Sequence, residues 1–100
     1  MAFIQIIEYQ TSRIEELQAL GEEFREHSAR ATGAKPLRGT VAADTDRPGH
    51  YVSIVEFASA EAATEAFGRP ETQAFFGRLS ALMDRPPSFY RLDVIETWEM

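Results

Sequence analysis

Three glutamates at matching places in the chain are the strongest candidates for acid–base chemistry. They close three short apolar triplets, Ile6–Glu8, Ile54–Glu56 and Val94–Glu96. A buried carboxyl group acquires a raised pKa and can act as a general acid or base. The triplets lie on strands of opposite direction, which places Glu8 toward one end of the predicted sheet and the other two glutamates toward the opposite end. We therefore interpret the glutamates as forming salt bridges across a dimer to Arg38, Arg91 or another arginine, and not as one catalytic cluster.

Tyrosines are the groups best suited to hold an aromatic molecule, because each joins an apolar ring to one hydroxyl. The chain has three, Tyr9, Tyr51 and Tyr90. The two histidines are weaker candidates for a role in binding or catalysis. We interpret His27, which lies among glutamates on a predicted helix, as a surface residue. His50 follows a Pro-Gly turn, and we interpret it as a solvated turn residue, with a place at the rim of a cavity as the alternative.

Composition excludes several classes of protein. The chain has 100 residues, no cysteine and a net charge of −6. Without cysteine there is no thiol nucleophile and no zinc–thiolate site, and the histidines lack the spacing of metal ligands. The acidic balance argues against nucleic acid as a partner. No stretch is apolar enough to cross a membrane and no signal peptide is recognisable, so we expect a cytoplasmic protein.

The order of the elements follows from periodicity and turn residues. Apolar residues at helical spacing predict a helix over about 12–32, started by a capping box of Ser12 and Glu15 and ended at Gly33. Ser59 and Pro70 are placed to begin two further helices. Runs of β-branched and aromatic residues predict four strands, which are Phe3–Gln10, Leu37–Asp44, Tyr51–Phe57 and Tyr90–Trp98.

The resulting order, β-α-β-β-α-(α)-β, is the ferredoxin-like pattern. It predicts an α+β fold in which a four-stranded antiparallel sheet carries all the helices on one face. The sequence shows no internal repeat and no stretch typical of a linker, so we expect a single domain over residues 1–100.

Both faces of this sheet are apolar, since side chains alternate sides along a strand. The face of Glu8 also holds Ile4, Ile6, Val52, Ile54, Glu56, Leu92, Val94, Glu96 and Trp98. The helices of one chain cover only one face, and the other would be a large exposed apolar patch. We therefore expect a homodimer through sheet-to-sheet packing. Phe57 sits just before the Ser59 cap, so we place its face under the helices and the Glu8 face at the dimer contact.

Polar side chains lie on the face placed under the helices. Gln5 and Ser53 fall beneath the helical layer, and Tyr9 and Tyr51 fall nearer the strand ends. Buried polar groups need hydrogen-bond partners. A ligand pocket between sheet and helices is one explanation, and ordinary hydrogen bonding to helix ends and water is the other.

The element order and two motifs resemble the dimeric α/β-barrel superfamily, and within it the antibiotic biosynthesis monooxygenase (ABM)-like group. The motifs are Val55–Ser59 and Pro70–Phe75, and the resemblance covers nearly the whole chain. The segments around Pro86 and Leu92–Val94 also resemble small actinobacterial members with no established activity.

The resemblance implies a dimeric barrel with a ligand cavity between each sheet and its helices. The chemistries it implies are cofactor-independent oxidation of aromatic polyketides, haem degradation, lactone isomerisation and cyclisation. Members commonly carry tryptophan where Phe57 stands, histidine where Ala66 stands and Pro-His where Pro70–Glu71 stands. Haem-degrading relatives use an asparagine on the first strand, and this chain contains no asparagine. We therefore expect neither haem nor another cofactor.

Two functions follow from these observations. The first is a cofactor-independent monooxygenase, isomerase or cyclase acting on a small apolar, aromatic or polyketide-like molecule. The second is a non-catalytic dimer with a ligand-binding, structural or stress-response role. A closed, polar-lined cavity would favour the first, and a space filled by Phe67, Phe75 and Met83 would favour the structural role. No catalytic residue is assigned, and the candidate ligand contacts are Gln5, Tyr9, Tyr51, Ser53, Phe67, Phe75 and Leu79.

Overall fold

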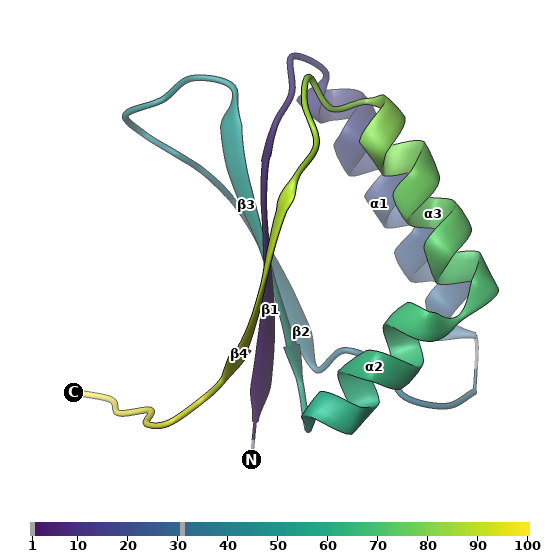
Figure 1. Ribbon diagram of the computed structural model, residues 1–100, viewed down its shortest axis with the longest axis vertical. Helices are drawn as coiled ribbons and strands as arrows, with labels where there is room; N and C mark the ends of the chain where they lie inside the picture. Colours follow the sequence, from purple (N-terminus) through teal and green to yellow (C-terminus); the bar gives the residue numbers. More distant parts are fainter. Residues whose placement is uncertain (1, 31) are drawn as a thin grey trace.

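Three helices lie on one face of a four-stranded antiparallel sheet in the computed structural model, which describes residues 2–30 and 32–100 (Figure 1). The order of the strands across the sheet is β2-β3-β1-β4. This arrangement confirms the predicted α+β, ferredoxin-like fold. In chain order the elements are β1 (Phe3–Gln10), α1 (Ile14–Ala29), β2 (Arg38–Ala43), β3 (His50–Phe57), α2 (Ala60–Gly68), α3 (Pro70–Ala81) and β4 (Ser88–Asp93).

The register of β1 with its two neighbours defines the faces of the sheet. Phe3 lies opposite Phe57 on β3 and opposite Asp93 on β4. Alternate residues of β1 from Phe3 onward are buried under the helices, and those between them are half-buried on the other side. The inner face, which the helices cover, consists of Phe3, Gln5, Ile7, Tyr9, Gly39, Val41, Ala43, Tyr51, Ser53, Val55, Phe57, Phe89, Arg91 and Asp93. The outer face consists of Ile4, Ile6, Glu8, Gln10, Arg38, Thr40, Ala42, His50, Val52, Ile54, Glu56, Ser88, Tyr90 and Leu92. The prediction that the Phe57 side faces the helices is confirmed.

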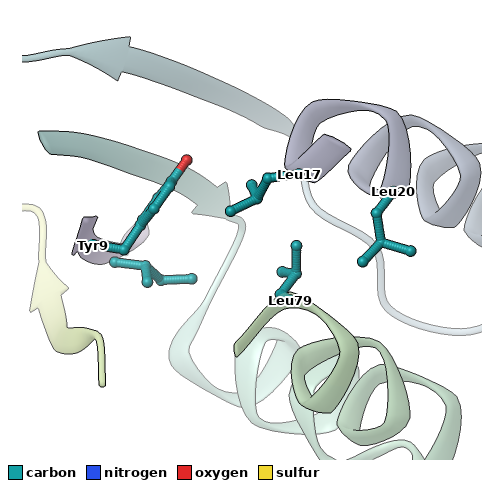
Figure 2. Close-up of a cluster of buried hydrophobic side chains, with 5 residues drawn as sticks. Tyr9, Leu17, Leu20 and Leu79 are labelled. Atoms are coloured by element: carbon teal, nitrogen blue, oxygen red, sulfur yellow. The ribbon is translucent and has the colours of Figure 1, made fainter. Parts of the chain in front are cut away.

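The core beneath the helices is divided into two clusters. The α1/α3 cluster joins the sheet to those two helices and is built on Ile7, Tyr9, Leu17, Leu20 and Leu79. Figure 2 shows the labelled members of this cluster directed toward one another. The α2 cluster, built on Phe3, Phe57, Ala63 and Ala66, lies beneath α2. In the described part of the chain, no helix is long and apolar enough to cross a membrane.

The start of α1 differs from the prediction. The N-cap residue is Arg13 and it makes no side-chain capping bond, so the predicted box of Ser12 and Glu15 is wrong. Thr11 serves the helix start instead, since its Oγ1 accepts a hydrogen bond from the Arg13 amide at 2.9 Å. The same hydroxyl donates to the carbonyl of Leu82 at 2.6 Å. Thr11 therefore joins the chain entering α1 to the chain leaving α3.

The end of α1 also comes earlier than predicted. The helix stops at Ala29, whose carbonyl accepts a hydrogen bond from Lys35 Nζ at 3.0 Å. Ala31, which falls within the predicted helix of residues 12–32, lies outside the described residues. Gly33 has a φ of +96°, a conformation that glycine adopts without strain. The starts of the other two helices are confirmed. Ser59 Oγ accepts from the Ala62 amide at 3.1 Å, and Pro70 opens α3.

The last strand is shorter than predicted and begins earlier. β4 covers Ser88–Asp93, so the Val94–Glu96 triplet and Trp98 are not part of the sheet. The physical reason is the length of its neighbour, because β1 begins at Phe3, opposite Asp93, and the ladder ends there. A single further bond joins the Val94 amide to the Ala2 carbonyl at 3.0 Å. The remaining residues leave the sheet on the side away from the helices (Figure 1).

A Thr11→Val substitution is expected to lower the free energy of unfolding by about 2 kcal/mol, because it leaves the Arg13 amide and the Leu82 carbonyl without the partner that they share. Thr11 is 1% exposed, so water replaces neither bond easily. Urea denaturation measures the loss. The control is Ser12→Ala, which removes the exposed hydroxyl that makes no cap and should change stability by less than about 0.5 kcal/mol. Equal effects of the two substitutions would contradict the role of Thr11.

Candidate functional site

The residues predicted to contact a ligand all lie where the sheet meets the helices. Four are on the inner face, one is on α2 and two are on α3, in the order Gln5, Tyr9, Tyr51, Ser53, Phe67, Phe75 and Leu79. The structure brings Tyr9, Tyr51, Phe75 and Leu79 together in the α1/α3 cluster. Phe67 packs against the other cluster, that of α2.

Gln5 occupies the boundary between the two clusters. Along β1 it stands between Phe3 of the α2 cluster and Ile7 of the α1/α3 cluster. The residue is only 7% exposed, yet within residues 2–30 and 32–100 its side-chain amide makes no hydrogen bond. In the same part of the chain, every side-chain nitrogen or oxygen sealed from solvent has a partner. The amide of Gln5 is therefore not sealed, and its donors and acceptor are free for water or a ligand.

Tyr9 and Ser53 form a second polar feature on the inner face. Tyr9 Oη and Ser53 Oγ are 3.2 Å apart, and the Tyr9 ring stacks on Tyr51 with centroids 5.9 Å apart. Burial is the main cause that raises the pKa of the Tyr9 phenol, and the hydrogen bond from Ser53 opposes it. The phenol therefore remains a neutral hydrogen-bonding group across the physiological pH range.

Aromatic rings continue from this point toward β4. Phe67 lies 5.7 Å from Phe57 and 5.3 Å from Phe76, measured between ring centroids. Phe76 in turn lies 6.1 Å from Phe89 on β4. Phe89 is 50% exposed although it is on the inner face, so the helices leave this part of the β4 edge uncovered. Neither Phe76 nor Phe89 is among the predicted ligand contacts, although alternation back from Asp93 would have placed Phe89 on this face.

Two hollows lie at the margins of this region. A groove of about 440 Å³ runs between α1 and α3, lined by Leu20 and by Phe75, which stacks on Phe24 at 4.1 Å. Its walls carry the exposed His27 among six charged or titratable side chains. A smaller hollow of about 140 Å³ lies where β1 ends and β3 begins, and the residues that line it include His50. Its position agrees with the alternative that His50 stands at a cavity rim.

The strand glutamates do not form a catalytic cluster. On the outer face Glu56 pairs with Arg38 of the same chain at 2.6 Å, and Glu8 accepts a hydrogen bond from the Tyr90 hydroxyl at 2.9 Å near the opposite end. The third, Glu96, lies beyond the sheet. No group of three His, Asp or Glu side chains suited to a metal ion occurs among residues 2–30 and 32–100.

Alkaline titration is expected to show two tyrosine phenols whose pKa values are raised. The pKa of Tyr9 is raised by burial and that of Tyr90 by its bond to the Glu8 carboxylate. Because the pKa of Tyr9 is higher in the folded state, its contribution to stability is complete below about pH 10 and is lost as the pH rises through the folded pKa. Phenolate absorbance measures the titration. Tyr9→Phe should remove one of the two components with a raised pKa, and Glu8→Gln should lower the pKa of the Tyr90 component toward that of a free tyrosine. Titration curves that do not change would contradict the assignment of these components to Tyr9 and Tyr90.

No protein-family model and no curated protein matches the chain in sequence. Solved structures match it closely in fold. SnoaB, a cofactor-independent oxygenase from Streptomyces nogalater, has a TM-score of 0.78 and 18% identity over 96% of this chain and 95% of that one. Rv0793 from Mycobacterium tuberculosis has a TM-score of 0.76 and 17% identity over 99% and 100% of the two chains. An antibiotic biosynthesis monooxygenase has a TM-score of 0.71 and 16% identity over 96% and 100%.

The chain therefore has the fold of the ABM-like proteins, as the resemblance in sequence predicted. At these identities the likeness concerns the fold, and a closer relation to actinobacterial members stays a prediction.

Proposed function

We propose that this chain is a single-domain, cytoplasmic ABM-like protein that binds a small aromatic or polyketide-like molecule between its sheet and its helices. In this proposal it acts on that molecule as a cofactor-independent monooxygenase, isomerase or cyclase. Gln5, Ser53 and Tyr51 orient the polar substituents of the ligand, and the rings of α2 and α3 exclude water from it.

The unengaged amide of Gln5, on a residue that is only 7% exposed, is the observation that carries the proposal. A polar group in an apolar layer destabilises the fold unless it has a partner, and in the described residues that partner is not another protein group. The aromatic rings of Phe67 and Phe76 pack beside each other above the sheet, and Phe89 at the β4 edge is 50% exposed. The fold shared with a cofactor-independent oxygenase supports the oxidation chemistry.

We propose further that the protein is a homodimer in which two outer faces pack together. This face carries apolar side chains that are only half-buried in one chain, and no helix of the described residues covers them; they include Ile4, Ile6, Val52 and Ile54. The segment after β4 adds further exposed apolar side chains, including Trp98, which is 69% exposed. An apolar surface of this extent is typical of an interface.

A non-catalytic dimer is the second candidate, and one observation favours it. Phe67, Phe75 and Met83 all pack against the two core clusters, which is the arrangement expected of a structural role.

Ligand binding by wild-type protein and Gln5→Leu tests the proposal. The probe is anthracenemethanol, a neutral fluorescent tricycle with one hydroxyl. Loss of the amide is expected to weaken binding about tenfold, the effect of one good hydrogen bond in an apolar site. The control is Gln18→Leu, the same change at an exposed position of α1, which should bind as the wild type does. Equal affinities of the wild type and Gln5→Leu for the probe would refute the proposed site.

Oxygen consumption with anthrone separates the two functions. In the oxidation, the CH₂ carbon of anthrone loses two hydrogens and gains one oxygen atom from O₂. The other oxygen atom leaves as water, and anthraquinone is the product. Oxygen uptake that exceeds the uncatalysed rate with the wild type, and returns to that rate with Gln5→Leu, supports the enzymatic function. Binding of the neutral probe with no added uptake supports the non-catalytic role.

A further inference from the structure

We propose that Arg91 is a specificity-determining residue that selects ligands with an anionic oxygen, so that the molecule bound beside Gln5 is an aromatic acid and not a neutral aromatic. This inference rests on the proposed function, because it concerns the same space between sheet and helices. It adds the chemical class of the ligand and the place where its charge is held.

The position of Arg91 follows from the register of the sheet. Arg91 on β4 is the direct cross-strand partner of Gln5 on β1, and both side chains belong to the inner face. Directly opposed positions have Cβ atoms about 5 Å apart. The free amide and the guanidinium group therefore start from neighbouring points at the open β4 edge, where the half-exposed Phe89 precedes Arg91 on the same face.

Neutral partners hold the guanidinium group in place. Arg91 Nη2 donates to Thr64 Oγ1 on α2 at 3.0 Å, and Arg91 Cζ lies 5.2 Å from the centroid of the buried Phe3 ring. A hydroxyl and an aromatic face fix the orientation of the cation without neutralising it. Of the five N–H donors that a guanidinium carries, this geometry uses one.

The charge of Arg91 is not balanced within the described residues. Arg91 is in none of the ion pairs formed by residues 2–30 and 32–100. Asp93, the one other charged residue on the inner face, lies one pair closer to the end of the sheet, opposite Phe3, and is in no ion pair there either. Arg91 therefore combines a charge that is in no ion pair with two oriented contacts, and its cross-strand neighbour is the free amide of Gln5.

This pair of side chains matches a carboxylate or an enolate on a planar ring. A guanidinium presents parallel donors that suit two oxygens, and the Gln5 amide supplies one further donor. The aromatic rings nearby accommodate the apolar body of the same molecule.

Two probes of nearly equal shape test the inference. Anthracenecarboxylate and anthracenemethanol, both substituted on the central ring, differ in the charge of the substituent. The wild type is expected to bind the carboxylate at least about tenfold more tightly than the alcohol, and added salt should reduce this ratio. Arg91→Met should bring the ratio to about one while the affinity for the alcohol stays unchanged. Arg91→Lys, which keeps the charge and loses the planar fork, should retain an intermediate ratio.

Arg78→Met is the matched control, because Arg78 is an exposed arginine on the α1/α3 groove away from β4. It should leave the ratio as in the wild type, and thermal unfolding shows whether each variant is folded. A wild-type affinity ratio of one would overturn the inference and leave the proposed function standing. An equal loss of affinity for both probes in Arg91→Met would do the same. If neither probe binds the wild type, the proposed function fails and this inference fails with it.

Discussion

An Ile54→Asp variant is expected to sediment as a monomer of 11.3 kDa, whereas the wild type at micromolar concentration should sediment at about twice that mass. Ile54 lies at the centre of the outer face, paired with Ile6 on one side and Thr40 on the other. A carboxylate placed there would be buried without a partner when two sheets pack together. The cost of at least about 3 kcal/mol raises the dissociation constant of the dimer by a hundredfold or more.

The substitution tests the interface and not the fold of one chain. Within the protomer Ile54 is only half-buried, so the variant should keep its far-ultraviolet circular dichroism. Ala81→Asp adds the same charge at an exposed position at the end of α3 and should remain dimeric. A monomeric wild type, or a dimeric Ile54→Asp variant, would contradict sheet-to-sheet packing.

A Phe57→Ala variant is expected to lose about 3–5 kcal/mol of stability, the largest loss that a single truncation in this chain should produce. Phe57 is 1% exposed and makes an edge contact with Phe67, with ring centroids 5.7 Å apart. A protein of this size has a total stability of about 5–15 kcal/mol, so much of the folded population should be lost on mild heating. Chemical denaturation at low temperature measures the difference.

Phe89→Ala is the appropriate control, because it removes the same ring from an inner-face position that is 50% exposed. Its loss should be about 1 kcal/mol, in proportion to the smaller area removed from water. If the two substitutions lower the free energy of unfolding by the same amount, burial does not distinguish the two positions, and the assignment of Phe57 to the core is wrong.

The sheet and its faces were predictable because they depend on long, regular patterns. Alternation along Phe3–Gln10 and the Ser59 cap after Phe57 were enough to place the Phe57 side under the helices. The ends of elements were less predictable because they depend on tertiary partners. Ser12 has the sequence of a cap, but Thr11 is the residue that reaches the end of α3, and local sequence does not reveal that contact.

The same distinction applies to the candidate site. Gln5 and Ser53 were identified from alternation alone, since a polar residue at an inward position is conspicuous. Alternation also places Arg91 on the inner face, but the contacts of its guanidinium group could not be foreseen. Its partners Phe3 and Thr64 lie far from it in sequence, and only the packing of α2 over the sheet brings them together.

The most direct test of the account is the NMR signal of the Gln5 side-chain amide during titration with anthracenemethanol. The chain has four glutamines and no asparagine, so few side-chain amide signals appear, and Gln5→Leu identifies the one that belongs to Gln5. If the ligand lies between sheet and helices, the Gln5 signals shift with the same saturation curve as the probe fluorescence, and those of Gln10 and Gln18 stay in place. Saturable shifts at Gln10 on the outer face or Gln18 on α1, with Gln5 unmoved, would contradict the account.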